Sequence, residues 1–390
     1  MNSSFKINTN VTRFLVENKE RVTFMSFSKF VTVVLLLVIS QNTVFAQQKT
    51  ENVFIIMTDG FRWQDLYGGA DSTLMNSKEF TSDSARTFGK FWAKTATERR
   101  EKLLPFFWNT IAKQGQLYGN RWEGNKVNVL NPYWFSYPGY NEVLSGYPDD
   151  KINSNDKKQN ENTTVLEFLN NQPKLKGKVA AFATWDVFPF IINENKSGVP
   201  VNAGVEEVKG KLSEKEVLLN EIQTQYPSLA SDRFDFVTYQ LAKEYVKKNT
   251  PKVMFLSFDE TDEFAHEGKY REYLFAANNF DKNVADLWNF CQKHPQYKGK
   301  TTFIILTDHG RGDKIKKQWT SHGQRVADCY QIWIAAIGPD TKPLGEVKTE
   351  GQLFQNQVAR TAAKLLGYDF LNASATENKP TGEVIWSILK

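Results

Sequence analysis

The stretch FIILTDHGRG, residues 303–312, joins an apolar run to an acid and a histidine. Five apolar or β-branched residues lead directly into Asp308 and His309, and two glycines around an arginine follow. A continuous apolar run is typical of a buried parallel strand. Polar side chains at the end of such a strand lie where open parallel sheets bind ligands. The whole chain has 4 histidines, so the position of His309 indicates a functional site.

Four other runs have the same character, and helix-like stretches lie between them. The runs are Val53–Met57, Val179–Ala183, Val253–Phe258 and Ile332–Ile337, and the helix-like stretches are Thr164–Leu169, Phe236–Val246, Tyr273–Phe290 and Val358–Leu366. Strands that alternate with helices predict an α/β fold, with a parallel sheet covered on both faces. Residues 148–162 and 191–232 are expected to be loop excursions from this framework.

The N-terminal residues 1–46 have the features of an extension with a signal peptide. Lys29 precedes the apolar run FVTVVLLLVI at 30–39, and Val44-Phe45-Ala46 provides a small residue for cleavage. The run is short for a membrane span, and Met25 is a candidate true start. We therefore expect one domain over residues 47–390, in a periplasmic or secreted protein. An uncleaved signal is the alternative, and the only membrane attachment that the sequence suggests.

Composition excludes a disordered or fibrous protein, because 41% of the residues are hydrophobic and 24% are charged. Residues 1–46 contain five Lys or Arg and two Asp or Glu, so the net charge of +5 falls to +2 without them. A nearly neutral chain gives no electrostatic reason to expect a nucleic-acid polymer as partner. The sequence does not indicate an oligomeric state.

The two cysteines, Cys291 and Cys329, leave two readings open. In an exported protein they could form a disulfide. They are far apart in sequence and have no metal-type spacing, so they could equally be free.

Acids follow three of the apolar runs. Asp59 comes after the first run, Asp262 lies four residues after the run that ends at Phe258, and Asp308 follows the run at 303–306. A single acid after a strand is often a helix N-cap. Three acids at the ends of strands, with histidines beside them, indicate a metal or active site.

The histidines add ligands to these acids. Asp262 and His266 are four residues apart, which places both side chains on one face of a helix. This pair is a normal zinc ligand pair, although by itself the spacing is more often a surface ion pair. His309 lies beside Asp308, His322 lies in SHG, and His294 lies in a polar loop. Three histidines and these acids suffice for two metal sites, and paired cations suit phosphoryl transfer.

A candidate nucleophile lies in NPYWFSYPGYNEVLSG, residues 131–146. Ser136 is placed on a Tyr-Pro-Gly turn, ahead of a helix-like stretch at 140–144. A hydroxyl near a helix N-terminus lies where an anion is favoured, and a metal can activate it. The alternative reading is an N-cap serine.

In order, the motifs TDGFR, FSYPGYNEVLSG, DETDEFAH and LTDHGRG…SHG resemble the alkaline phosphatase superfamily. They are most similar to its nucleotide pyrophosphatase/phosphodiesterase-like branch, and the resemblance runs from residue 53 to about 340. It implies an α/β/α sandwich with a mostly parallel central sheet. It also implies an exported two-metal hydrolase acting on small-molecule phosphate esters, either diesters or monoesters.

The resemblance assigns a role to each motif residue. Asp262, His266 and His322 would hold one Zn²⁺, and Asp59, Asp308 and His309 the other, with Mn²⁺ as the alternative metal. Ser136 would lie against the second metal and form a phospho-enzyme intermediate. Asn155, with Asn153 as second choice, and Arg311 are the candidates for contacts with the substrate phosphate. Arg62 is expected instead to brace the first loop through an ion pair.

Other functions were weighed against this one. A sulfatase would need an arginine at the position of Tyr140, which argues against that activity. A phosphoglycerate mutase-like metalloenzyme of the same superfamily and a non-catalytic binding protein on the same fold remain alternatives. An export signal argues against the first, and the intact ligand set argues against the second.

Overall fold

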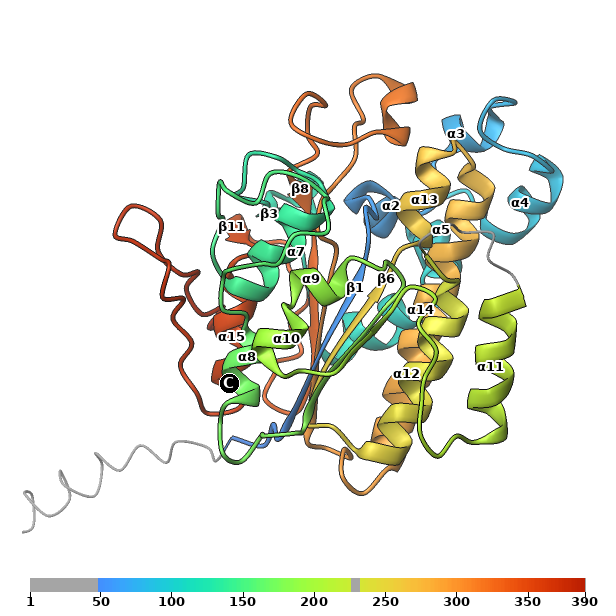
Figure 1. Cartoon of the computed structure of the whole chain (residues 1–390). Helices are drawn as coiled ribbons and strands as arrows, with labels where there is room; N and C mark the ends of the chain where they lie inside the picture. Colours follow the sequence, from blue (N-terminus) through green and yellow to red (C-terminus); the bar gives the residue numbers. More distant parts are fainter. Residues whose placement is uncertain (1–47, 226–231, 390) are drawn as a thin grey trace, which may run out of the picture. The chain divides into compact units, whose positions relative to one another are not determined.

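The central layer of the protein is a sheet that contains eight strands within the described residues, 48–225 and 232–389 of the computed structural model (Figure 1). Its order is β10-β2-β9-β7-β1-β6-β4-β5. The strands β7, β1, β6, β4 and β5 run parallel, while β9 is antiparallel to both of its neighbours. Their bounds are β1 Asn52–Thr58, β2 Gln116–Tyr118, β4 Val179–Ala183, β5 Val201–Ala203, β6 Val253–Phe258, β7 Thr301–Leu306, β9 Ile334–Ile337 and β10 Gly345–Glu346.

Helices cover both faces of this sheet, as Figure 1 shows. Phe54 and Ile56 of β1 point into one core, together with residues of α2 (Trp63–Gly68), α5 (Ala96–Leu103), α12 (Asp235–Asn249) and α14 (Tyr270–Lys293). Val53, Ile55 and Met57 point into the other core, which contains residues of α7 (Ser136–Ser145), α8 (Val165–Asn170), α9 (Phe188–Ile191) and α15 (Gln357–Leu365). Helices on both faces of a mostly parallel sheet confirm the expected α/β/α sandwich. β1 is apolar on both faces because both faces are buried.

One expected strand is divided in the structure. Residues 332–337 form the end of β8 (Gln331–Ile332) and all of β9, with Trp333 between them. β8 belongs to a second sheet with β3 (Asn125–Asn128) and β11 (Gly351–Phe354). The Trp333 indole is buried and donates a hydrogen bond to the carbonyl of Phe61 at 2.9 Å. The chain therefore changes sheets at Trp333.

The remaining elements differ from expectation mainly in one segment. Residues 148–162 contain no helix or strand, as expected. The described part of 191–232, which was expected to be irregular, contains α10 (Glu194–Ser197), β5 and α11 (Glu214–Gln225). The other elements are α3 (Ser72–Asn76), α4 (Ser84–Phe91), the π-helix η1 (Phe107–Ile111), α6 (Ala112–Gln114), η2 (Arg121–Glu123), α13 (Glu260–His266) and η3 (Lys316–Thr320).

Two further expectations concern the cysteines and the N-terminus. Cys291 and Cys329 are both buried and free, so they are not paired with each other. The proposed signal peptide at 1–46 lies outside the described residues. None of the described helices is long and apolar enough to cross a membrane.

A buried ion pair braces the loop after β1. The Arg62 guanidinium donates to both carboxylate oxygens of Asp65, at 2.7 and 2.9 Å. The hydroxyls of Tyr270 and Tyr273 also donate to Asp65, at 2.8 and 2.9 Å. Both charged side chains are at most 1% exposed. The expected role of Arg62 is thus confirmed, and the ion pair ties α14 to the residues that follow Asp59.

We expect Asp65→Ala to lower the free energy of unfolding by about 3–5 kcal/mol, because it removes the buried partner of the Arg62 charge and leaves only the partly exposed Asp313, 3.5 Å away. The double variant Arg62→Met/Asp65→Ala should lose less, since no buried charge then remains. The exposed pair Arg360–Asp369 provides a control, and Asp369→Ala should cost at most about 1 kcal/mol. Urea unfolding measures all three. A single variant no less stable than the double variant would contradict the prediction.

Candidate metal centre

The order of the strands brings the sequence-predicted acids together. β1 lies between β6 and β7, with Thr58 paired to Phe258 and Met57 paired to Leu306. The three strands are parallel, so their carboxyl ends meet at one edge. Asp59 follows β1, Asp308 follows β7, and α13 begins directly after β6 and carries Asp262. The residues predicted from strand ends therefore converge.

His309 Nε2 lies at the middle of the first group of potential ligands. It is 3.1 Å from Asp59 Oδ1, 3.5 Å from Asp308 Oδ2 and 3.8 Å from Asp262 Oδ1. Asp59, Asp308 and His309 are at most 1% exposed. The backbone carbonyl of Gly310 lies 3.0 Å from His309 Nδ1, which fixes the ring and leaves Nε2 facing the carboxylates.

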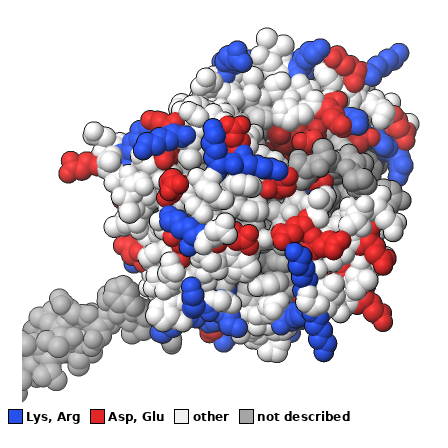
Figure 2. Space-filling model, viewed as in Figure 1, with Lys and Arg blue, Asp and Glu red and all other residues white. Residues whose placement is uncertain are grey.

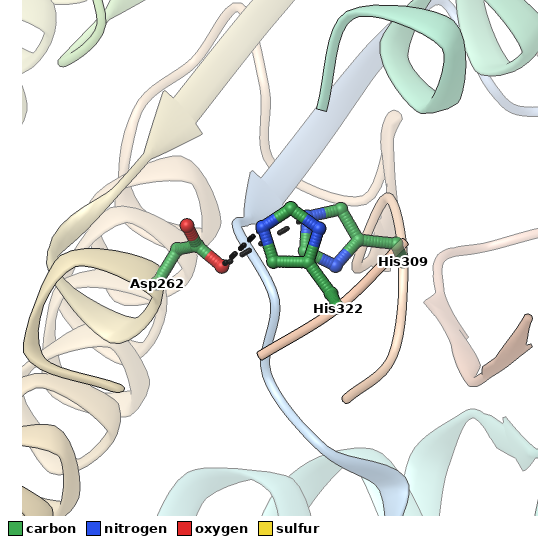
Figure 3. A group of neighbouring side chains, drawn as sticks. All are labelled: Asp262, His309 and His322. Carbon is green, nitrogen blue, oxygen red and sulfur yellow. Dashed lines mark ion pairs between the residues drawn. The ribbon is translucent and has the colours of Figure 1, made fainter. Parts of the chain in front are cut away.

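The second group surrounds Asp262, and Figure 3 shows His309 and His322 turned toward its carboxylate. Its Oδ1 is 3.8 Å from His322 Nε2, and its Oδ2 is 3.0 Å from His266 Nε2. His266 Nε2 and His322 Nε2 are 2.9 Å apart. Asp262 and His266 share one face of α13, as their spacing predicts. The two groups are contiguous, since His309 reaches Asp262 as well as Asp59.

The buried polar atoms of the first group fit a cation. Asp59 Oδ1, Asp308 Oδ2 and His309 Nε2 are buried and have no hydrogen-bond partner among the described residues. Polar atoms buried without partners are rare, because each costs free energy of desolvation. Carboxylate oxygens and an imidazole nitrogen are zinc ligands. The donor set and its unsatisfied atoms are therefore those of a metal site.

The charges in this site are poorly balanced. Burial raises the pKa of Asp59 well above its ordinary value, and the Asp262 charge adds to this shift. Burial and the Asp59 charge likewise raise the pKa of Asp308. Burial also acts to raise the pKa of Asp262, but Arg311, His322 and His266 outweigh it and lower that pKa. Burial and His309 lower the pKa of His322, which favours the neutral imidazole that binds metals.

Two glycines allow the chain to approach this closely. Gly60 has φ +57°, and a side-chain carbon there would lie 2.4 Å from Asp262 Oδ1. Its backbone N–H donates to Asp308 Oδ1 at 3.1 Å. At Gly139, a side-chain carbon would lie 2.6 Å from the Asp308 carbonyl oxygen. Glycine is therefore required at both positions.

Ser136 is the first residue of α7, whose N-cap is Phe135. The helix thus begins four residues earlier than expected, and Ser136 is neither on a preceding turn nor the N-cap. The same first turn packs Gly139 against Asp308. Tyr140 in the next turn donates to Asp59 Oδ2 at 3.0 Å. These contacts hold the helix start that carries Ser136 beside the Asp59–Asp308–His309 group.

The two candidate phosphate contacts lie in different places. Asn155 Oδ1 accepts a hydrogen bond from the Tyr137 N–H at 3.0 Å, so Asn155 lies next to Ser136. Arg311 is 1% exposed and donates to the carbonyls of Trp319 and Thr320, at 2.7 and 2.8 Å, and to Asp262. These contacts favour a positioning role for Arg311, and its contact with the substrate phosphate stays a prediction.

Sequence reasoning missed residues that hold the site together. Ser257 donates to the Tyr140 hydroxyl at 3.0 Å, while Tyr140 in turn donates to Asp59. Glu142 is fully buried and accepts from the backbone N–H groups of Leu130 and Asn131, at 3.0 and 2.8 Å. It thereby fixes the loop before Ser136. The sequence did contain one signal for this role, because Glu142 is an acid among the apolar residues of a helix.

Comparison with known proteins places this geometry in a family. Residues 135–369 match the family model described as the Metalloenzyme superfamily. The match covers more than half of the chain, so the chain belongs to this superfamily. None of the curated proteins matches the sequence.

Solved structures of the alkaline phosphatase superfamily share the fold. Alkaline phosphatase PafA is 12% identical with a TM-score of 0.56, over 88% of this chain and 100% of that one. The phosphonate monoester hydrolase SpPMH from Silicibacter pomeroyi is 13% identical with a TM-score of 0.53, over 87% and 76%. The 2-O GAG sulfatase BT1596 is 13% identical with a TM-score of 0.50, over 87% and 74%. The expected superfamily is confirmed, and at these identities the likeness concerns the fold.

The raised pKa values of Asp59 and Asp308 predict how the chelator-treated protein responds to pH. The pKa values of these two carboxyls are higher in the folded state than in the unfolded state. Their stabilising contribution to the free energy of unfolding is therefore complete below about pH 4 and is lost as pH rises through the folded-state pKa. His322 acts in the opposite direction, because its lowered folded-state pKa stabilises the fold as pH rises through about 6.5. The contribution of the carboxyls is therefore measured as the difference in pH dependence between the wild type and a variant that lacks one of them.

Urea unfolding in the presence of chelator measures this difference. Asp308→Asn removes one of the two titrating carboxyls, so its free energy of unfolding should depend less on pH than that of the wild type. An identical pH dependence of wild type and Asp308→Asn between pH 5 and pH 8 would show that these carboxyls are not crowded in solution.

Proposed function

We propose that this protein is an exported two-metal hydrolase of phosphate esters that uses Ser136 as nucleophile. The observation that carries the proposal is the set of buried, unsatisfied ligand atoms on Asp59, Asp308 and His309 beside the start of α7. The resemblance to the nucleotide pyrophosphatase/phosphodiesterase-like branch supports it. The fold that the chain shares with a phosphatase and a phosphonate hydrolase is compatible with it.

The ligand groups suit two cations. Asp262, His266 and His322 would hold one ion, and Asp59, Asp308 and His309 the other. Mixed carboxylate and imidazole donors favour Zn²⁺, with Mn²⁺ as the alternative. Such ions, when bound, stabilise negative charge on both the attacking and the leaving oxygen of a phosphoryl group.

The residues of the chain supply the covalent step. The Ser136 hydroxyl loses its proton to water and its oxygen attacks phosphorus, while the bond to the leaving-group oxygen breaks and that oxygen takes up a proton from water. Water then attacks the phosphorylated serine, which restores the hydroxyl and releases phosphate from a monoester or a phosphate monoester from a diester. Pro138 has no N–H, and the N–H groups of Tyr137 and Gly139 donate to Asn155 and to the Phe135 carbonyl. The positive end of the α7 dipole would still favour an anion at Ser136. The Asn155 amide, next to Ser136, would contact a phosphate oxygen through its N–H groups.

The substrate's leaving group would occupy a cleft of about 680 Å³ beside His322. Its walls include Tyr133, Phe135, Asn153 and Arg325. Aromatic and cationic side chains suit a leaving group with a flat or anionic portion.

Export is part of the same proposal. The apolar run at 30–39 and the cleavage site at Ala46 support a signal peptide, which would leave residues 47–390 as a single periplasmic or secreted enzyme. Sequencing of the N-terminus of the protein recovered from the periplasm or medium tests this. An intact residue 30 in that fraction would favour an anchored form.

Hydrolysis of an aryl phosphate monoester and of the matching diester, with Zn²⁺ and with chelator, tests the activity. Chelator-sensitive hydrolysis of either ester supports the proposal, and the ratio of the two rates assigns the protein as a phosphodiesterase or a phosphatase. If neither ester is hydrolysed, the mutase-like or binding function gains support.

Ser136→Ala should lower kcat on the preferred ester by on the order of 10³-fold or more, because it removes the hydroxyl that would form the covalent intermediate. Zinc content should remain at two equivalents. Ser145→Ala, at the other end of α7, is the control and should retain activity. Retained turnover in Ser136→Ala would exclude the serine as nucleophile.

His309→Ala and His322→Ala should each reduce the bound zinc from two equivalents to about one, since each removes one imidazole ligand from a different ion. Elemental analysis after dialysis measures the content. His294→Ala is the matched control, because His294 lies at the C-cap of α14, outside both groups. Two equivalents in either site variant would show that the ligand assignment is wrong.

A further inference from the structure

A third group of carboxylates lies beside α13, separate from the two groups described above. Asp232, Asp259 and Glu263 each place a carboxylate oxygen within 4.8 Å of the others. No imidazole belongs to this group, and none of its members is a proposed zinc ligand. Figure 2 shows Asp and Glu side chains gathered over α13 on the face in view.

Asp259 is the central observation. Its side chain is 8% exposed, and it occupies the N-cap position of α13 without capping the helix. Asp235 performs that function instead, because its carboxylate accepts from the N–H groups of Asp259 and Glu260, at 2.9 and 3.2 Å. An aspartate at an N-cap normally accepts such bonds itself. Here the Asp259 carboxylate is left for another partner.

The described residues provide no such partner. No hydrogen-bond donor among them reaches the Asp259 carboxylate, and the strongest charges around it are the carboxylates of Asp59, Asp232, Asp262 and Glu263. The nearest arginine in sequence, Arg233, directs its guanidinium to Thr238, Asn202 and the Ala183 carbonyl. A buried carboxylate surrounded by like charges is costly unless a cation compensates it.

We propose that Asp232, Asp259 and Glu263 bind a third divalent cation, of the hard class represented by Ca²⁺ and Mg²⁺. Oxygen-only donors favour these ions over Zn²⁺. Glu263 is exposed, so water from the solvent side can complete the coordination.

The position of this site implies a structural role. Asp259 and Glu263 lie at the start of α13, the helix that carries Asp262 and His266. Asp232 precedes α12 and is distant from α13 in sequence. A cation shared by these residues would tie the start of α13 to the chain before α12. The third cation would thus hold a ligand-bearing helix in place without contacting the substrate.

Calorimetric titration of the zinc-loaded full-length protein with Ca²⁺, and separately with Mg²⁺, tests the site. We expect one further equivalent of at least one of these ions to bind. Asp259→Asn should abolish this binding and Glu263→Gln should weaken it by at least tenfold, both with two equivalents of zinc retained. Glu267→Gln is the matched control, because Glu267 is an exposed acid at the end of α13 that pairs with Lys269.

The outcomes separate this proposal from the proposed function. Absence of a third equivalent for both ions, or unchanged affinity in Glu263→Gln, would overturn the third site whatever the activity toward esters. Loss of Ca²⁺ or Mg²⁺ binding only together with loss of zinc would overturn it as well. If Asp259→Asn does not fold, Glu263→Gln decides, because it changes an exposed side chain. Inactivity toward phosphate esters with the third equivalent present would contradict only the proposed function.

Discussion

The crowding of three carboxylates around one imidazole is the constraint on which the rest of the structure depends. Asp59, Asp262 and Asp308 all approach His309 Nε2 in a buried site. Charges repel more strongly there than in water, because the interior screens them less. The Arg311 guanidinium offsets the Asp262 charge and lowers its pKa against the effect of burial, whereas the pKa values of Asp59 and Asp308 stay raised. The site therefore requires further positive charge.

The protein holds these groups together through contacts that do not bear charge. The Gly60 N–H and the Tyr140 hydroxyl donate to Asp308 and Asp59, respectively. Register is equally important, because a one-residue slip of β1 would turn Asp59 to the opposite face of the sheet. Burial alone does not prevent that slip, because β1 is apolar on both faces. The hydrogen bonds from the Gly60 N–H to Asp308 and between the Thr58 and Thr261 hydroxyls, at 3.1 and 2.8 Å, fix the register instead. These contacts stabilise an arrangement that electrostatics alone would oppose.

Much of this arrangement could be predicted from sequence, where the information is local. Continuous apolar runs located β1, β4, β6 and β7, and four-residue spacing placed Asp262 and His266 on one helix face. The division at Trp333 could not be predicted, because it depends on pairing between β8 and the distant β3.

The start of α7 was misjudged, and the contacts of the Arg311 guanidinium were not foreseen, for similar reasons. Pro138 and Gly139 suggested a turn, yet proline is tolerated in the first turn of a helix, and Gly139 is required by the contact with Asp308. The position of Arg311 beside the motif did not reveal where its guanidinium points. Both features depend on tertiary contacts, which local sequence does not encode.

In the proposed enzyme, the choice of substrate would be determined outside the proposed metal ligands. Proteins named as a phosphatase, a phosphonate hydrolase and a sulfatase share this fold, so the fold does not select among their esters. Selection would fall to the loops at 131–135 and 321–326, which line the cleft beside His322. Glu142 holds the first loop, and Arg311 holds the carbonyls of Trp319 and Thr320 before the second. Exposed side chains on these loops can therefore change, and with them the substrate, while the buried acid and arginine keep the backbone in place.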